Sequence, residues 1–365
     1  MAGGVIVVGT GLLGTSVGLA LRRAGVDVTL LDRDPAALAE AVRLGAGRRH
    51  EPHALPAALA VVAVPPTATG STVAAVLDDR LAEYATDVAS VKALPAGEVR
   101  ALAAEPGRYV GGHPMAGREV SGPRAGLVDL FDGRPWVLCP EDHTDPQAVT
   151  RALEVARLAG AVPVTMSPAD HDAAVALVSH APHLVAALVA GRFVEPPDHE
   201  LRLAGPGVSD VTRVAAADPG MWSEILAANA GAVAQVLSAL RADLDQALDA
   251  LRGGPGDTDG GKTALAELLS RGSAGRRRLP GKHGAPATVY VTVAVIVDDR
   301  PGQLARLFAD VGRAGVNVED VRIEHRPGQP VGVVELDVQP GAERALGEAL
   351  LAAGWTMHGP ALPSS

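Results

Sequence analysis

One histidine stands directly before a proline and among several glycines, in the stretch GGHPMAGREVSG at residues 111–122. Pro114 restricts His113 to extended backbone angles, and the glycines leave room for a ligand to approach the backbone closely. The stretch therefore predicts a loop that aims the His113 imidazole at a bound molecule. The alternative is a tight loop in which the histidine is incidental.

A second pattern with chemical meaning lies near the N-terminus, where Gly9, Gly11 and Gly14 form G-x-G-x-x-G between an apolar run and a helical one. The first glycine permits a tight turn, the second lets the backbone approach a pyrophosphate, and the third lets the helix pack on the strand. Asp32 ends the next apolar run, where a carboxylate accepts hydrogen bonds from a ribose diol and repels a 2′-phosphate. The pattern predicts dinucleotide binding and favours NAD over NADP, a preference that Arg33 weakens because arginine can meet a phosphate.

Composition narrows the class of protein. Of the 365 residues, 47% are hydrophobic and 20% charged, which is typical of a globular protein. The net charge of −10 argues against nonspecific binding to nucleic acid or to anionic membranes. The single cysteine, Cys139, excludes an intrachain disulfide and a thiolate zinc site, and favours a reducing, cytoplasmic location. We expect no signal peptide and no transmembrane helix. We also expect no metal site, since His180 and His183 lack a carboxylate at ligand spacing.

The elements that would position these residues begin with alternating strands and helices. The apolar runs GVIVV, VDVTLL, LAVVAV, DVASVK, YVGGHP and PWVLC read as strands. Their alternation with helical stretches predicts a doubly wound, mostly parallel sheet, which is a Rossmann-type dinucleotide-binding domain over residues 1–166.

The next segment, residues 167–286, is predicted to be all-helical. A long helix is expected from Ser167, kinked near Pro182, and a second of about 30 residues from Met221 to Arg252. The leucines of the second helix recur at helical spacing, and so long an apolar stripe predicts packing against a second subunit in a homodimer. After a flexible break we expect a short helix, KTALAELLSRG, and a basic irregular linker, SAGRRRLPGKHGAPA.

The last segment, residues 287–365, reads as strand, helix, strand, strand, helix, strand. This βαββαβ order predicts a separate ferredoxin-like domain. The fold class expected for the whole chain is therefore α/β: a Rossmann-type domain, an all-α dimerisation and substrate domain, and a ferredoxin-like domain.

Several ordered motifs together carry a family resemblance. The set GTGLLGTSVGLAL, VAVPP, DVASVK, GGHPMAGREVSG, HDAAVALVSHAPH, DVTR and MWSEI resembles the prephenate and arogenate dehydrogenases of tyrosine biosynthesis, over about residues 4–285. The tail resembles an ACT domain, a small module that senses amino acids. The resemblance implies NAD-dependent oxidative decarboxylation of prephenate to 4-hydroxyphenylpyruvate.

The resemblance also implies roles for particular residues. His113 would accept the proton of the substrate 4-hydroxyl, for which an unperturbed imidazole pKa of about 6.5 is suited. Ser90 would orient His113 or share the hydroxyl contact, whereas Lys92 reads as a solvated or structural cation. The cofactor would contact Gly9, Gly11, Leu12, Leu13, Gly14, Asp32, Arg33, Val64 and Pro65.

For the substrate, the resemblance implies a carboxylate clamp. Arg213 offers a planar fork to a carboxylate, and Asp210, three residues earlier, would hold that fork. His180 and Trp222 would line the site and Glu119 would gate it. The alternatives are that Trp222 is core and that Glu119 is a surface charge.

In the tail, the resemblance implies an amino-acid ligand, for which we expect the pathway product tyrosine. Pro301 and Gly302 stand at a strand-to-helix turn, where free backbone N–H groups can bind a carboxylate. Gln303, Leu304 and Asn317 would complete the site. The alternative is that the tail only dimerises.

Three other functions fit parts of the sequence. Arogenate dehydrogenase differs only in the amine that the substrate side chain carries. A β-hydroxyacid dehydrogenase shares the layout but does not require the HPMAG and SHAPH motifs. A non-catalytic, amino-acid-responsive regulator would not need a positioned base.

Overall fold

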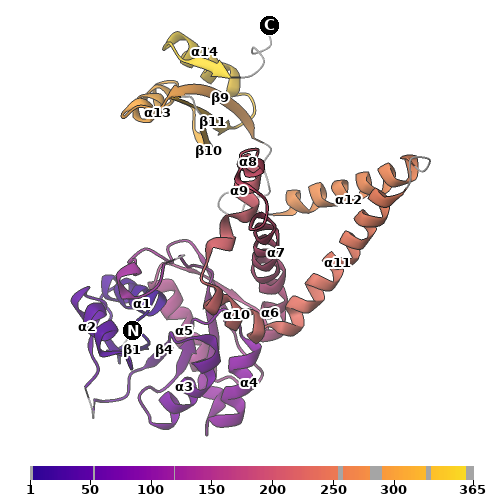
Figure 1. Cartoon of the computed structure of the whole chain (residues 1–365). Coiled ribbons are helices and arrows are strands. Elements are labelled where there is room, and N and C mark those ends of the chain that lie inside the picture. Colours follow the sequence, from indigo (N-terminus) through magenta and orange to yellow (C-terminus); the bar gives the residue numbers. More distant parts are fainter. Residues whose placement is uncertain are drawn as a thin grey trace. The chain divides into compact units, whose positions relative to one another are not determined.

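The computed structural model describes residues 3–51, 54–118, 120–253, 258–279, 290–325 and 330–358 (Figure 1). The chain divides into two units, Met1–Ala242 and Asp243–Ser365. Glu119 and most of the predicted basic linker lie outside the described residues.

The first unit is organised by an eight-stranded sheet with the order β3-β2-β1-β4-β5-β6-β7-β8. All neighbouring pairs are parallel except β6 and β7, which are antiparallel. This confirms the doubly wound, mostly parallel sheet. The strands are β1 (Val5–Val8), β2 (Val28–Leu31), β3 (Arg48–Arg49), β4 (Leu59–Val62), β5 (Ala85–Asp87), β6 (Tyr109–Pro114), β7 (Pro135–Cys139) and β8 (Val162–Thr165).

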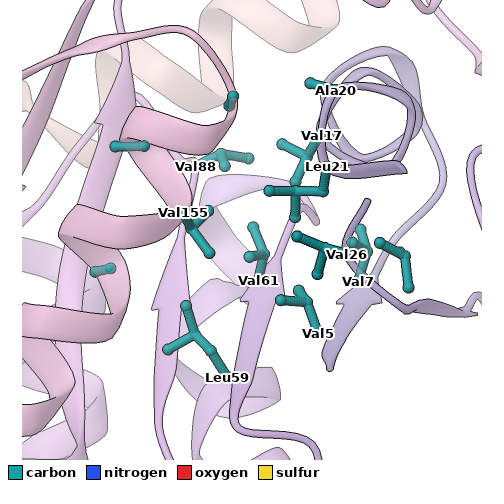
Figure 2. Packing of buried hydrophobic residues seen from close by; sticks show 14 of the residues in the cluster. Val5, Val7, Val17, Ala20, Leu21, Val26, Leu59, Val61, Val88 and Val155 are labelled. Atoms are coloured by element: carbon teal, nitrogen blue, oxygen red, sulfur yellow. The ribbon is translucent and has the colours of Figure 1, made fainter. Parts of the chain in front are cut away.

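Both faces of this sheet are buried. Alternate residues of β1 point to opposite faces and enter two different hydrophobic cores. Val5 and Val7 pack with helices on one face, as Figure 2 shows, whereas Ile6 and Val8 pack on the other. Residues of α1, α2 and α5 complete the first core, and residues of α3 and α4 complete the second. The helices are α1 (Leu12–Arg23), α2 (Pro35–Arg43), α3 (Pro66–Asp78), α4 (Ala93–Leu102) and α5 (Pro146–Leu158).

The long helix expected from Ser167 is interrupted where a kink was predicted. Helix α6 (Pro168–Val175) passes into a π-helical turn at Ala176–His180, and α7 (Ala181–Ala190) follows. Pro182 has no N–H for the bond that an α-helix requires, so the irregular turn lies directly before it. Ser167 caps α6 by accepting a hydrogen bond from the Asp170 N–H at 3.1 Å.

Length and hydropathy would allow the stretch Pro168–Phe193 to span a membrane, which the sequence prediction had not anticipated. The stretch nevertheless carries the buried polar residues His171, Asp172 and His180. These side chains hydrogen-bond to other parts of the first unit, so this side of the stretch packs within the protein.

The single helix predicted for Met221–Arg252 is wrong, because two helices meet at Asn229 with a bend of 95°. They are α10 (Pro219–Ala228) and α11 (Ala230–Arg252). The buried Asn229 side chain donates to the backbone carbonyl of Asp172 at 2.8 Å, and this tertiary bond stabilises the break. Before α10 come the short helices α8 (Asp198–Leu201) and α9 (Pro206–Thr212) and the 3₁₀ turn η5 (Arg213–Ala216).

In the second unit, the predicted short helix is longer than expected. Helix α12 (Thr258–Arg278) includes Arg276, Arg277 and Arg278, which were assigned to an irregular linker. Alanine, leucine and arginine are good helix formers, and α12 is tied to α11 by an ion pair between Arg271 and Asp243. A Cβ at Gly261 would lie 2.7 Å from the Ala250 carbonyl oxygen, so glycine allows the two helices to approach closely.

The remainder of the second unit has the predicted βαββαβ order and a four-stranded antiparallel sheet, β10-β11-β9-β12. Leu307 of α13 and Leu346 of α14 pack on Val295 of the sheet in one core. This confirms a ferredoxin-like domain. Its elements are β9 (Val291–Asp298), α13 (Gln303–Arg313), β10 (Val318–His325), β11 (Val331–Val338), α14 (Glu343–Ala352) and β12 (Thr356–His358).

Candidate functional site

The glycine motif lies between the carboxyl end of β1 and the start of α1. Gly9 has a φ of +97°, a conformation that glycine adopts readily. A Cβ at Gly14 would lie 1.9 Å from the Gly9 carbonyl oxygen, so only glycine lets the helix begin so close to the turn. A Cβ at Gly11 would meet no atom within 4 Å, which leaves its backbone open to a ligand. These three features fit a dinucleotide pyrophosphate at the α1 N-terminus.

The Asp32 carboxylate lies beside this turn and is fixed there by three hydrogen bonds. One carboxylate oxygen accepts hydrogen bonds from the Thr10 N–H at 2.5 Å and the Thr10 hydroxyl at 2.7 Å, and the other accepts from the Asp34 N–H at 2.8 Å. Burial raises the pKa of Asp32, but these hydrogen bonds outweigh it, so the net pKa is lowered and the carboxylate stays charged. Arg33 is exposed.

The other predicted cofactor residues surround the same edge of the sheet. Leu12 and Leu13 are the first residues of α1 and are partly buried. Val64 and Pro65 connect β4 to α3, and a Cβ at Gly9 would lie 3.2 Å from a Val64 methyl carbon. The structure thus brings Gly9 and Val64 together, as the resemblance implied.

His113 is the penultimate residue of β6, where it pairs with Val137 of β7, so it lies in a strand rather than in a free loop. A buried ion pair stabilises this strand at Gly112, the residue before His113. Lys92 pairs with Asp87 and donates to the Gly112 carbonyl oxygen at 2.6 Å, while both charged side chains are fully buried. Asp87 also accepts from the Tyr109 hydroxyl at 2.6 Å. Lys92 is therefore a structural cation, one of the two roles expected for it.

The His113 ring is linked to a second histidine. Its Nδ1 lies 2.8 Å from Nε2 of His171, and Nδ1 of His171 lies 2.8 Å from Oδ1 of Asp172. The Asp172 carboxylate accepts two further hydrogen bonds, from the Lys92 and Ala93 N–H groups at 2.8 Å each. These N–H groups open helix α4, so a carboxylate is favourably placed there. The result is a chain of hydrogen bonds from a charged carboxylate to His113.

His180 lies near this chain of hydrogen bonds, and Trp222 contacts His180. Nδ1 of His180 is 3.1 Å from the Asn229 side-chain nitrogen, and the His180 and Trp222 ring centroids are 6.1 Å apart. Trp222 stacks on His183, with ring centroids 3.5 Å apart and an angle of 9° between the planes. Trp222 therefore joins α10 to α7 through histidine contacts.

Burial disfavours the protonated forms of His113 and His180. Burial, followed by the neighbouring His171, Lys92 and His180, holds the pKa of His113 well below its usual range. Burial likewise lowers the pKa of His180 to about 4, although the Asp172 charge acts in the opposite direction. A neutral His113 can accept a proton at physiological pH.

The strand predicted for DVASVK, residues 87–92, is displaced, because β5 covers Ala85–Asp87 and only Asp87 of the predicted segment belongs to it. Ser90 therefore lies in the loop from β5 to α4. The Ser90 hydroxyl oxygen is buried and has no hydrogen-bond partner among the described residues. Buried hydroxyls are nearly always paired, and this oxygen is available to pair with a ligand hydroxyl.

Asp210 and Arg213 do not share one regular helix. Asp210 belongs to α9, which ends at Thr212, and Arg213 opens the 3₁₀ turn η5, which packs against α7. Both residues are exposed. Glu119, the predicted gate, lies outside the described residues.

In the ferredoxin-like domain, the predicted turn is present between β9 and α13. Gly302 has a φ of +89°, and a Cβ there would meet no atom within 4 Å. Gln303 is the first residue of α13, and Leu304 is 38% exposed. Asn317 precedes β10 and donates to a Glu319 carboxylate oxygen at 2.6 Å.

Sequence reasoning missed His171, Asp172 and Asn229. The motif HDAAVALVSHAPH contains the first two, but their spacing along the helix does not distinguish them from surface residues. Their hydrogen bonds are to His113 and Lys92, which are distant in sequence. For metal binding, no group of three or more histidine, cysteine, aspartate or glutamate side chains is arranged to hold an ion within the described ranges.

Comparisons with known proteins agree with this geometry. Residues 17–165 match a family model described as the prephenate dehydrogenase nucleotide-binding domain, and residues 167–270 match the prephenate dehydrogenase dimerization domain. A probable prephenate dehydrogenase of Streptomyces niveus, NovF, is 42% identical over 349 residues, covering 94% of this chain and 96% of that protein. A prephenate dehydrogenase of Bacillus subtilis is 26% identical, covering 68% of this chain and 67% of that protein.

Two solved structures are similar along most of their length. The prephenate dehydrogenase of A. aeolicus, crystallised with hydroxyphenyl propionate and NAD+, has a TM-score of 0.66 and 27% identity. The alignment covers 76% of this chain and 98% of that one. The arogenate dehydrogenase of Synechocystis has a TM-score of 0.63 and 27% identity, with 74% of this chain and 98% of that one covered.

Proposed function

The chain belongs to the prephenate dehydrogenase family, and from this premise we propose that it catalyses the NAD-dependent oxidative decarboxylation of prephenate to 4-hydroxyphenylpyruvate. The observation that carries the assignment to a working enzyme is His113, a neutral imidazole held by hydrogen bonds in the first unit. A non-catalytic regulator would have no need for such a base.

The cofactor would be held by the turn at Gly9, Gly11 and Gly14, with Asp32 at the adenosine ribose. When bound there, NAD supplies the hydride acceptor for C4 of the substrate ring. Leu12, Leu13, Val64 and Pro65 would line the same edge, with Arg33 at its exposed rim. The hydrogen bonds from Thr10 and Asp34 keep Asp32 charged, which disfavours a 2′-phosphate.

His113 would accept the proton of the 4-hydroxyl as C4 loses hydride. The bond between C1 and the carboxylate then breaks, its electron pair enters the ring, CO2 leaves, and the new phenolic oxygen recovers a proton. Ser90 would contact the same hydroxyl, which would give its orphaned buried oxygen a partner.

For the rest of the substrate, Arg213 would bind a carboxylate with Asp210 orienting it, His180 and Trp222 would line the site, and Glu119 would close it. Replacing Arg213 with Ala should raise the KM for prephenate, and replacing it with Lys should restore the KM only in part, because an ammonium lacks the planar fork. An unchanged KM in both variants would remove Arg213 from the site.

The domain boundaries that we propose are 1–166 for the nucleotide domain, 167–286 for the dimerisation and substrate domain, and 287–365 for the tail. The family model over residues 167–270 is a dimerization domain, which supports a homodimer. Helix α11 carries exposed leucines on one stripe, Leu240, Leu244, Leu248 and Leu251, that a partner subunit would cover. A cytoplasmic location remains a prediction.

The tail would act as an ACT domain that binds tyrosine. Gly302 and Gln303 provide an open turn before α13, an 11-residue helix whose N-terminus favours a carboxylate. Leu304 and Asn317 would complete this site. The tail would then make the enzyme sensitive to the product of its pathway.

Arogenate dehydrogenase is the second candidate, because a structure of that activity is as similar in identity as the prephenate enzyme of A. aeolicus. The test is NADH formation with prephenate and with arogenate at equal concentrations. A higher kcat/KM for prephenate is expected. A preference for arogenate would reassign the substrate, and no oxidation of either would overturn the enzymatic assignment.

A further inference from the structure

We propose that His171 and Asp172 are positioning residues that hold His113 in one tautomer, with a proton on Nδ1 and a free lone pair on Nε2. This inference rests on the proposed function, because it explains how His113 is kept ready as a base. It assigns a role to two side chains that would otherwise be read as buried structural groups.

The first step of the argument is the state of Asp172. Its carboxylate accepts hydrogen bonds from the Lys92 and Ala93 N–H groups. Burial raises the pKa of Asp172, but the His171 side chain and these two hydrogen bonds outweigh burial and lower that pKa. A charged carboxylate can only accept hydrogen bonds. The Nδ1 atom of His171, 2.8 Å from Oδ1, must therefore carry a proton and donate it.

The second step follows from the first. In this proposal His171 is neutral, and a neutral imidazole has one donor and one acceptor nitrogen, so its Nε2 is an acceptor. The nitrogen 2.8 Å from it is Nδ1 of His113, which must then be the donor. This leaves Nε2 of His113 unprotonated, which is the state that a general base requires.

Burial makes this order of donors and acceptors strict. His171 is 0% exposed and Asp172 is 5% exposed, and an unpaired buried donor or acceptor costs about 1–3 kcal/mol. If the proton of either imidazole moved to its other ring nitrogen, two lone pairs or two N–H groups would face each other. The charged, fixed Asp172 carboxylate therefore determines, through His171, which nitrogen of His113 carries the proton.

The same chain stabilises His113 after it accepts a proton. The imidazolium would keep its Nδ1–H bond to His171, which in turn donates to the Asp172 carboxylate. The other groups that face His113 are His180, which is neutral near pH 7, and Lys92, whose charge is paired with Asp87. Asp172 is thus the negative charge to which the hydrogen-bonded chain connects.

The direct test is nuclear magnetic resonance of the full chain labelled with ¹⁵N in its histidine side chains, at pH 8, without substrate. In the wild type, we expect the ring signals of His113 to report a proton on Nδ1. In His171→Leu and in Asp172→Asn, we expect the Nε2-protonated form to appear. The surface variant His143→Leu should leave the His113 signals unchanged.

The kinetic test uses the same three variants. His171→Leu and Asp172→Asn should lower kcat by between about 10- and 1,000-fold while the Kd for NAD stays within about twofold, and His143→Leu should match the wild type. A wild-type His113 that carries its proton on Nε2, or a His171→Leu enzyme that has lost the tautomer but keeps its kcat, would overturn the proposal. If one variant fails to fold, the other provides the same two readings.

The two measurements separate this inference from the proposed function. If the wild type does not oxidise prephenate or arogenate, the proposed function fails, yet the NMR spectrum still determines the tautomer. If the enzyme is active and His113 is protonated on Nε2, only the present inference fails.

Discussion

Nδ1 of His113 lies 2.8 Å from Nε2 of His171, although 58 residues separate them in the chain. His113 comes from strand β6, and His171 from helix α6, which follows the nucleotide-binding sheet. The contact joins the Rossmann-type sheet to the helical region at the point where the base would act. Five predictions follow from the geometry around it and from the cofactor and tail sites.

Replacing His113 with Asn should lower kcat by roughly 10²–10⁴-fold, because an amide cannot accept the hydroxyl proton. NAD binding should change little, since the glycine turn is separate from β6. Steady-state kinetics and a direct titration with NAD would measure the two effects. Near-normal turnover would show that His113 is not the base.

The pH dependence of kcat/KM should show an acidic limb with its midpoint below 6.5. Burial and the neighbouring His171 lower the pKa of His113, so the base stays neutral and active as the pH falls through 6.5 and is lost only at lower pH. Initial rates from pH 5 to 9 would measure this midpoint. A midpoint above 6.5 would contradict the depressed pKa.

Unfolding must be followed over the same range as a control. His180 has a folded-state pKa of about 4, so from about pH 6.5 down to about 4 the unfolded chain binds a proton that the folded chain does not. The free energy of unfolding should therefore fall by up to about 1.4 kcal/mol per pH unit over that window. Denaturant titrations would show where loss of activity precedes loss of structure.

Replacing Lys92 with Met should destabilise the protein by about 3–5 kcal/mol, because Asp87 would remain buried without its cation. The double variant with Asp87→Asn should recover part of this loss, since the uncompensated charge is gone. Thermal or urea unfolding would give both values. Equal stability of the wild type and Lys92→Met would mean that the ion pair does not support strand β6.

The wild-type enzyme should have a higher kcat/KM with NAD than with NADP. Asp32→Ala should narrow that difference, because removing the carboxylate removes both the ribose hydrogen bond and the repulsion of a 2′-phosphate. Kinetics with both cofactors would test this. Arg33→Ala is the matched variant, and it should widen the preference for NAD rather than narrow it.

A chain ending at Gly284 should oxidise substrate but lose any tyrosine inhibition that acts through the tail. Gly302→Val should weaken the same inhibition in the full chain, although a φ of +89° means that valine would also strain the turn. Inhibition that is competitive with substrate and unchanged in both proteins would place tyrosine in the catalytic site. The tail would then be left with a structural or dimerising role.

Much of this molecule is determined by local patterns in the sequence. Apolar residues at every position of β1 require a strand that is buried on both faces, and the spacing of Gly9, Gly11 and Gly14 requires a tight turn before a helix. The βαββαβ order of the tail follows in the same way. Pro114 restricts His113 to extended backbone angles, which agrees with its place in strand β6.

Other features were decided only by tertiary contacts. Met221–Arg252 has helical periodicity throughout, yet the chain turns at Asn229, whose side chain bonds to Asp172 and His180. The environment of His113 depends on Lys92 and on the pair His171–Asp172, which folding brings beside it. Hydrogen bonds and desolvation act through space over a few ångströms, so residue spacing along the chain cannot encode them, whereas strand alternation and glycine turns are set by neighbouring residues.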